Sequence, residues 1–199
     1  MPTFQRLILT LHGLALAVWL AALVASGLFA ATLFPTMKTL NPSVPAFREY
    51  AGEHWRLAAG VPANNIFTLA DRIQFVCAGA ALMTLGFWLA GLARRKQEGD
   101  SVSLPAAVLR ITTLTGAMAG LCYQLFILGP RMGAALRNWV VAATEGRTSD
   151  AEAFRAIFDA DHPAASRTLG LTALCVLMCL TVHLWNGDTV GPRRPGVGL

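Results

Sequence analysis

The sequence predicts an all-α integral membrane protein, an antiparallel bundle of four transmembrane helices with short extramembrane helices in its two outer loops. Composition is the first observation behind this prediction. Of 199 residues, 55% are hydrophobic and only 14% are charged, whereas soluble domains carry about 25% charged residues. The second observation is that four separate stretches each hold the roughly 20 apolar residues that a bilayer crossing takes. The predicted spans are residues 4–34, 72–93, 104–129 and 164–186, in a single domain covering 1–199.

The first span resembles a signal peptide at one point, because Ala25-Ser26-Gly27 has the small residues of a cleavage site. Its apolar run continues through Leu33 and Phe34, however, and is longer than the apolar region of a signal peptide. We therefore expect a retained transmembrane helix.

The first outer loop follows this span. Its segment AFREYAGEHWRLAAG, residues 46–60, has apolar positions on one helical face and predicts a short helix. Pro62 is then expected to open the second helix at its first turn. Asp71 and Arg72, adjacent and opposite in charge, are expected at the outer boundary, solvated or paired at the surface.

The third span carries one charged residue near its start, Arg110, whose long side chain is expected to reach the headgroups. In the second outer loop, Ser149 and Glu152 have capping-box spacing and predict a short helix at 150–158. The fourth span follows, with Asp161 as a natural N-cap and Pro163 in the first turn.

Charge distribution predicts the orientation. Four spans place both termini on one side, and basic residues are denser there than on the other side, which makes it cytoplasmic by the positive-inside rule. The basic residues on that side are Arg6, Arg94, Arg95, Lys96, Arg193 and Arg194, against the acids Glu98, Asp100 and Asp188. We expect a multi-pass protein of the cell (inner or plasma) membrane. The net charge of +5 follows from this topology and requires no nucleic acid partner.

The segment CVLMCLTVH in the fourth span places Cys175, Cys179 and His183 at i, i+4 and i+8, on one face of a helix. Three interpretations stay open: a path for a soft metal ion such as copper, one end of a haem site, or ordinary membrane packing. From the predicted spans, His12 in the first span is expected at a depth comparable to that of His183 in the fourth. The two histidines are therefore the candidate axial ligands of a b-type haem.

A second candidate cluster lies on the outer side. Asp161 and His162 precede the fourth span, and His54 projects from the first outer loop together with Glu49 and Glu53. Histidines with carboxylates suit Zn²⁺ or Mn²⁺ if the two loops meet. The alternative is that Asp161 only caps a helix and that the other acids are solvated.

Three segments carry a resemblance to a known family. LHGLALAVWLAALVASGLFAATLFP in the first span, LFILGPRM at 125–132, and Phe158 to His162 followed by Ser166 are similar to the TMEM205-like (DUF4149) membrane proteins. The first outer loop, with FREYAGEHWRL, departs from that family. The resemblance implies a four-span protein associated in some relatives with tolerance of metal-containing compounds. A similar first span in copper-resistance D-type membrane proteins would imply copper handling.

These patterns favour a non-enzymatic membrane protein that binds or helps transport a metal ion or small solute. His54, Asp161 and His162 would bind it outside, and Cys175, Cys179 and His183 would pass it inward. One alternative is a haem b electron-transfer subunit with ligation by His12 and His183. Another is a structural subunit of a larger membrane complex. In each case we expect lipid contact and either a homo-oligomer or partner subunits.

Overall fold

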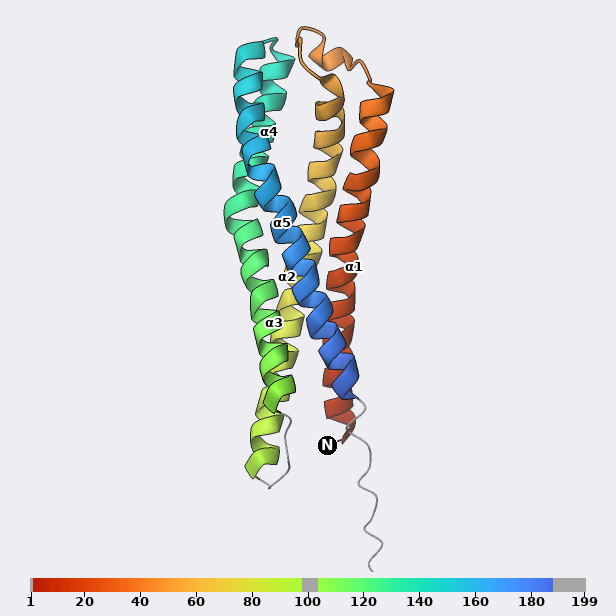
Figure 1. Ribbon diagram of the computed structural model, residues 1–199, viewed down its shortest axis with the longest axis vertical. Helices are drawn as coiled ribbons and strands as arrows, with labels where there is room; N and C mark the ends of the chain where they lie inside the picture. Colours follow the sequence, from red (N-terminus) through yellow and green to blue (C-terminus); the bar gives the residue numbers. More distant parts are fainter. Residues whose placement is uncertain (1, 98–103, 188–199) are drawn as a thin grey trace, which may run out of the picture.

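The computed structural model describes residues 2–97 and 104–187, and within them the chain is all-helical (Figure 1). In chain order its elements are α1 (Pro2–Leu40), the 3-10 turn η1 (Pro45–Phe47), α2 (His54–Gln97), α3 (Leu104–Tyr123), the π-helical turn η2 (Gln124–Leu128), α4 (Gly129–Thr144) and α5 (Thr148–Gly187). Residues 98–103, in the predicted inner connection, and 188–199, in the predicted C-terminal tail, lie outside the described residues, and with them Glu98, Asp100, Asp188, Arg193 and Arg194.

Four stretches of helix are long and apolar enough to cross a membrane, which confirms this part of the prediction. They are Thr3–Leu40, His54–Ala93, Pro105–Thr144 and Thr148–Trp185, each of 38 or 40 residues. The third joins α3, η2 and α4 end to end. A crossing takes about 20 residues, so each stretch is about twice the necessary length. With a rise of 1.5 Å per residue, each extends over roughly 60 Å.

The second outer loop of the prediction is mostly helix. Residues 129–163 form α4 and the beginning of α5, and only residues 145–147 connect the two. In that connection Gly146 adopts a φ of +70°, a conformation that favours glycine. The predicted helix at 150–158 exists, but as the first part of α5, so Asp161 and Pro163 lie inside a helix and Asp161 is not its N-cap.

The first outer loop also differs from its prediction. The helix expected at 46–60 is absent as a separate element, since η1 covers only three residues and α2 begins at His54. Pro62 lies inside α2 and does not open it, just as Pro35 lies inside α1. Each of these prolines removes one backbone hydrogen bond, yet the helix continues through it.

The bundle has two ends, shown in Figure 1. At the N-terminal end α1 begins and α5 ends, and at the distal end lie η1 and the connection between α4 and α5. Along the bundle α1 packs mainly against α2, while α5 packs against α4, α3 and α1. Drawn in blue, α5 starts beside α4 at the distal end and finishes beside α1 at the N-terminal end. It therefore crosses the molecule and joins the α1–α2 pair to the α3–α4 column.

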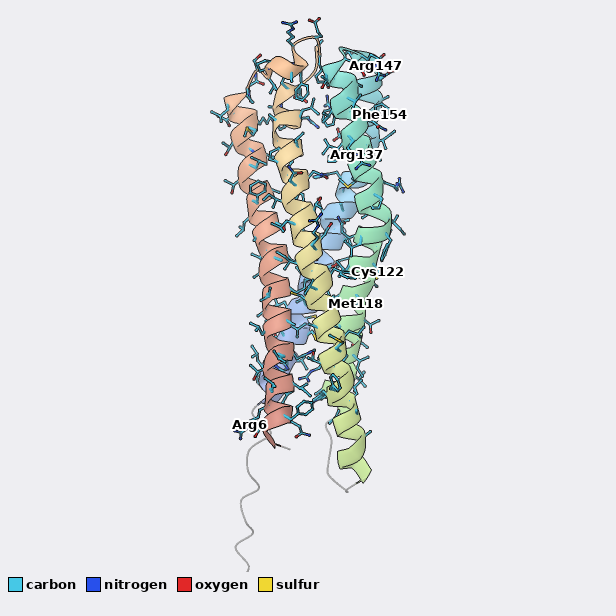
Figure 2. All side chains as sticks on the ribbon, turned by 180° about the vertical axis from the view of Figure 1, so that it is seen from behind. Arg6, Met118, Cys122, Arg137, Arg147 and Phe154 are labelled. Carbon is cyan, nitrogen blue, oxygen red and sulfur yellow. The ribbon has the colours of Figure 1, made fainter. Side chains whose placement is uncertain are left out.

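Side-chain burial divides into two cores and an apolar outside. Trp19 and Leu114 belong to the core in the α1–α2–α3–α5 region, and Trp139 belongs to the core at the distal end. Large apolar side chains are exposed all along the helices, among them Phe75, Met83, Phe126 and Leu171. Figure 2 shows Arg6 at the N-terminal end and Arg137 and Arg147 toward the distal end, with Met118 and Cys122 between them. Lipid would cover this apolar surface without the cost it has in water.

Candidate functional site

A pocket of about 270 Å³ lies in the distal half of the bundle, between α1, α2, η2, α4 and α5. The pocket lies between the α1–α2 pair on one side and the α3–α4 column with α5 on the other. Its wall is mainly apolar and includes three aromatic side chains, Phe34, Phe67 and Phe158. The polar and charged lining residues are Asn64, Thr68, Asp71, Gln124, His162 and Ser166. An apolar pocket with a few polar groups is the usual form of a small-molecule site.

Asp71 supplies the carboxylate of this distal pocket. Its side chain is half-buried, and its Oδ1 accepts a hydrogen bond from Gln74 Nε2 at 3.2 Å. Gln74 is buried and accepts in turn from Trp19 Nε1 at 3.1 Å, so α1 and α2 together fix the position of the carboxylate. No ion pair in the described part of the chain includes Asp71. The sequence predicted a solvated or paired surface position for this residue instead.

The π-helical turn η2 shapes another wall of the pocket. The Gly129 N–H donates to the carbonyl of Gln124, five residues earlier, where an α-helix would use the fourth. Pro130 follows and lacks an N–H, so it cannot restore the α-helical pattern through Phe126. A Cβ at Gly129 would lie 2.9 Å from the Gln124 carbonyl oxygen, so this turn requires glycine. Single π-turns inside helices are frequent at functional sites.

A second polar cluster lies in the N-terminal half, around His12 on α1 and His183 on α5. Both side chains are buried, and their rings meet edge to face with centroids 5.2 Å apart. His12 Nδ1 lies 2.8 Å from Thr84 Oγ1 on α2. A Cβ at Gly13 would lie 2.9 Å from His183 Nε2, so glycine permits this approach of α5 to α1. Haem ligation by both histidines would require the touching rings to separate by the thickness of the macrocycle.

Arg110 on α3 lies close enough to His12 and His183 to interact electrostatically with both, and it does not reach toward the surface as predicted. Only 3% of the residue is exposed, and its guanidinium carbon lies 4.4 Å from the centroid of the Trp88 ring on α2. This distance is within the range of a cation–π interaction. Cys179, which is buried, donates a weak hydrogen bond from its Sγ to the Arg110 backbone carbonyl at 3.8 Å. We call His12, Thr84, Arg110 and His183 the histidine–arginine cluster.

The three residues predicted to bind a metal ion on the outer side have separate roles. Both ring nitrogens of His54 are occupied: Nδ1 accepts from the Val44 N–H at 3.2 Å, and Nε2 donates to the Tyr50 carbonyl at 2.9 Å. Asp161 accepts from Arg131 Nη2 at 3.0 Å. His162 is exposed, stacks on Phe158, and lines the distal pocket. The three side chains do not form one site.

No group of three His, Cys, Asp or Glu side chains that could hold a metal ion occurs in residues 2–97 and 104–187. Of the predicted inner ligands, Cys175 is half-buried and packs against α3, where a Cβ at Gly116 would lie 3.1 Å from its Sγ. Cys179 and His183 lie in the N-terminal half, near Arg110. The residues of the predicted stripe therefore contact different neighbours along α5.

A polar network at the distal end joins the connection between η1 and α2 to α4 and α5. Tyr50 is buried, donates to Glu152 Oε1 at 2.5 Å and accepts from Trp139 Nε1 at 3.2 Å. Burial raises the pKa of Tyr50 above its ordinary value, and the hydrogen bond to Glu152 raises it further. Arg155 pairs with Glu152 at 3.1 Å and with Glu53 at 3.2 Å. This network holds the distal ends of the helices together beside the pocket.

Sequence reasoning did not propose Asp71 or Arg110 as site residues. The available signal was a charged residue at the edge of an apolar stretch, which marks a functional candidate by default. That signal does not distinguish a side chain turned to the headgroups from one turned into the bundle. The direction depends on the rotation of each helix about its axis, which tertiary packing sets.

Comparison with known protein families, with curated proteins and with solved structures gives no match to this chain. The resemblance to the TMEM205-like (DUF4149) and copper-resistance D-type proteins therefore stays a prediction.

Proposed function

We propose that this chain is a multi-pass protein of the cell membrane, folded as an antiparallel four-helix transmembrane bundle with both termini in the cytoplasm. Four long apolar helices and their exposed apolar side chains support insertion. The start of α1 and the end of α5 lie at the same end of the bundle (Figure 1). The excess of basic residues on that side supports a cytoplasmic position.

In this orientation the distal pocket lies at the outer boundary of the membrane. Phe34, Asp71, Gln124 and Ser166 line it, and each lies within a few residues of the outer end of one of the four apolar spans. The distal part of the bundle, beyond the pocket, then projects into the aqueous phase. A solute can reach the pocket from the water or from the outer leaflet.

We propose further that the protein binds a small organic cation in the distal pocket, as a non-enzymatic binding or transport protein. One observation carries this proposal: Asp71 presents a half-buried carboxylate to the pocket, and no cation in the described part of the chain pairs with it. A carboxylate removed from water is stabilised by an opposite charge. A cationic ligand would supply that charge.

The remaining wall indicates what kind of cation fits. Phe34, Phe67 and Phe158 offer aromatic faces, which attract ammonium groups through cation–π interactions. A volume of about 270 Å³ is just below the usual range for ligand pockets and suits a compact amine or quaternary ammonium with an apolar body. A bare metal ion is a poorer fit, because three suitable ligands do not come together in the described residues.

The test is the binding of benzyltrimethylammonium to the purified full-length protein, measured by isothermal titration calorimetry. We expect Asp71→Asn to weaken binding about tenfold or more, since a charge-assisted contact contributes more than 1.4 kcal/mol. Glu49→Gln makes the same change of charge at an exposed distal position and should leave binding unchanged. Equal affinity in the wild type and in folded Asp71→Asn would exclude the proposal.

A further inference from the structure

The histidine–arginine cluster contains buried nitrogen atoms that have no hydrogen-bond partner: His12 Nε2, His183 Nδ1 and Arg110 Nε. The three residues are 2%, 6% and 3% exposed, so water outside the protein does not reach them. Orphaned buried polar atoms are costly and rare, and each is expected to have an ordered partner. This cluster has three such atoms, and they come from three different helices.

The hydrogen bonds of Thr84 determine which ring nitrogen of His12 carries the proton. Thr84 donates its single hydroxyl proton to a backbone carbonyl, that of Ala80 at 2.7 Å or Ala81 at 3.0 Å. Its oxygen must therefore accept from His12 Nδ1, which carries the proton. In neutral His12 the bare lone pair is then on Nε2, the atom that has no partner.

His183 has the same arrangement. It bonds to the backbone of Leu9, and because its Nδ1 has no partner, the bonding atom is Nε2, which also lies against Gly13. Donation from Nε2 to a carbonyl leaves the lone pair of neutral His183 on Nδ1. In each imidazole, therefore, one nitrogen donates the hydrogen bond that orients the ring, and the other carries a lone pair that has no partner. When protonated, both bare nitrogens become hydrogen-bond donors.

The charge of the cluster is positive. Arg110 is always protonated, and no carboxylate in the described chain pairs with it. The other titratable groups facing the cluster are His12 on α1 and Cys179 and His183 on α5, while α2 contributes Thr84 and Trp88, which do not titrate. A metal cation would be repelled by Arg110. A buried arginine without an acid favours an anion.

The geometry points to a binding site for a tetrahedral oxyanion at this cluster, held by Arg110 Nε and by the protonated imidazoles of His12 and His183. Binding requires protons, because the bare lone pairs of neutral imidazoles repel an anion, whereas imidazolium N–H groups donate to it. The site is independent of the cation pocket at Asp71.

The surface beside the cluster is indented toward the N-terminal end. A small pocket of about 60 Å³ between α1 and α2 is lined by Leu9, whose backbone holds His183, and by Trp88, which stacks on Arg110. Arg6 lines the same pocket and is exposed. In the proposed orientation this pocket faces the inner leaflet, where two sources supply the same chemistry: free oxyanions and the phosphates of acidic lipids.

The experiment uses sulfate as the probe, because its charge does not change between pH 5.5 and pH 8. Full-length protein in phosphatidylcholine nanodiscs is titrated with sulfate at both pH values by calorimetry. We expect binding to be at least about tenfold tighter at pH 5.5, because the bound anion favours the protonated imidazoles and binding therefore takes up protons. Arg110→Gln should abolish binding at both pH values. His12→Gln and His183→Gln should each reduce the pH dependence.

Control variants keep the result interpretable. Arg48→Gln removes an exposed distal arginine and should bind sulfate as the wild type does. Arg110→Lys keeps the charge but loses the Nε donor, and should bind more weakly than the wild type while folding. Circular dichroism and gel filtration identify any variant that fails to fold. The inference is overturned if the folded wild type binds no sulfate at pH 5.5, if binding is independent of pH, or if Arg110→Gln binds equally.

The two anion sources are separated by repeating the titration in nanodiscs that contain phosphatidylglycerol. If a lipid phosphate occupies the site, the apparent sulfate affinity at pH 5.5 falls in the wild type, and phosphatidylglycerol is retained by the wild type but not by Arg110→Gln. An unchanged affinity assigns the site to a soluble oxyanion. Both results support the anion site.

Discussion

Tyr50 occupies an unusual position for a single side chain, since its hydroxyl joins residues of α4 and α5 to the connection between α1 and α2. Tyr50→Phe keeps the ring but removes the donor to Glu152 and the acceptor for Trp139. We expect the variant to be less stable by about 1–2 kcal/mol, the usual cost of leaving buried polar groups unpaired. Thermal unfolding in detergent, followed by tryptophan fluorescence, measures the change. A variant as stable as the wild type would show that the hydroxyl contributes nothing net.

The same residue predicts a pH dependence. Burial and the bond to Glu152 raise the pKa of Tyr50 in the folded protein above the value of about 10 in the unfolded chain. The neutral phenol therefore contributes stability that is fully present below about pH 10 and is lost as the pH rises through the folded pKa. Tyr50→Phe should lack this part of the alkaline loss. Unfolding temperatures of both proteins between pH 8 and pH 11 test the difference.

Individual site residues were only partly predictable. The spacing of Cys179 and His183, and the comparable depth of His12, singled out residues that lie in or beside the histidine–arginine cluster, whereas Cys175 of the same stripe packs against α3. The sequence could not reveal that Thr84, seventy-two residues from His12, would orient that imidazole. Nor could it reveal that Trp88 would cover the Arg110 guanidinium. Both contacts depend on how helices from separate parts of the chain are rotated.

At the scale of an element, η2 is the feature that most directly shapes the distal pocket. Gly129→Ala places a Cβ within 2.9 Å of the Gln124 carbonyl oxygen, a backbone atom that moves only if the turn changes. We expect the turn to rearrange, with a loss of about 1–3 kcal/mol in stability and about tenfold weaker binding of benzyltrimethylammonium. Calorimetry and thermal unfolding measure the two effects.

A matched control for this substitution is Gly170→Ala on α5, where an added Cβ meets nothing within 4 Å. It should leave binding unchanged, and it should slightly stabilise the protein because alanine favours a helix over glycine. If Gly129→Ala bound the cation as well as Gly170→Ala does, the π-helical turn would not shape the binding site.

The sequence predicted that the four apolar stretches are helical, but it did not predict how far the helices extend. Apolar composition is a strong signal inside a membrane span and disappears where the helix enters water. In α4 the signal changes to an amphipathic pattern, in which Leu136, Trp139 and Ala143 are buried on one face. Gly129-Pro130 at its start, and Pro62 and Pro163 in the other helices, suggested helix boundaries, but the helices continue through these positions.

At the scale of the whole molecule, the proposed orientation is open to a direct test. Ser43 lies in the connection between α1 and η1, at the distal end, and Thr3 lies at the N-terminal end. In intact cells we expect Ser43→Cys to react with a membrane-impermeant maleimide and Thr3→Cys to react only after permeabilisation. The wild type, whose cysteines all lie in helices, provides the background. The reverse pattern would place the termini outside.

The crossing path of α5 has a mechanical consequence. One continuous helix carries Ser166 at the distal pocket and His183 against Gly13, about 25 Å apart at 1.5 Å per residue. A tilt of α5 by about 10° around a point midway between them displaces the two residues in opposite directions, each by on the order of 2 Å. His183 lies close to the α1 backbone at Leu9 and Gly13, which limits its displacement toward α1. Because α5 is one continuous helix, the contact between His183 and α1 also limits how far Ser166 can move at the distal pocket.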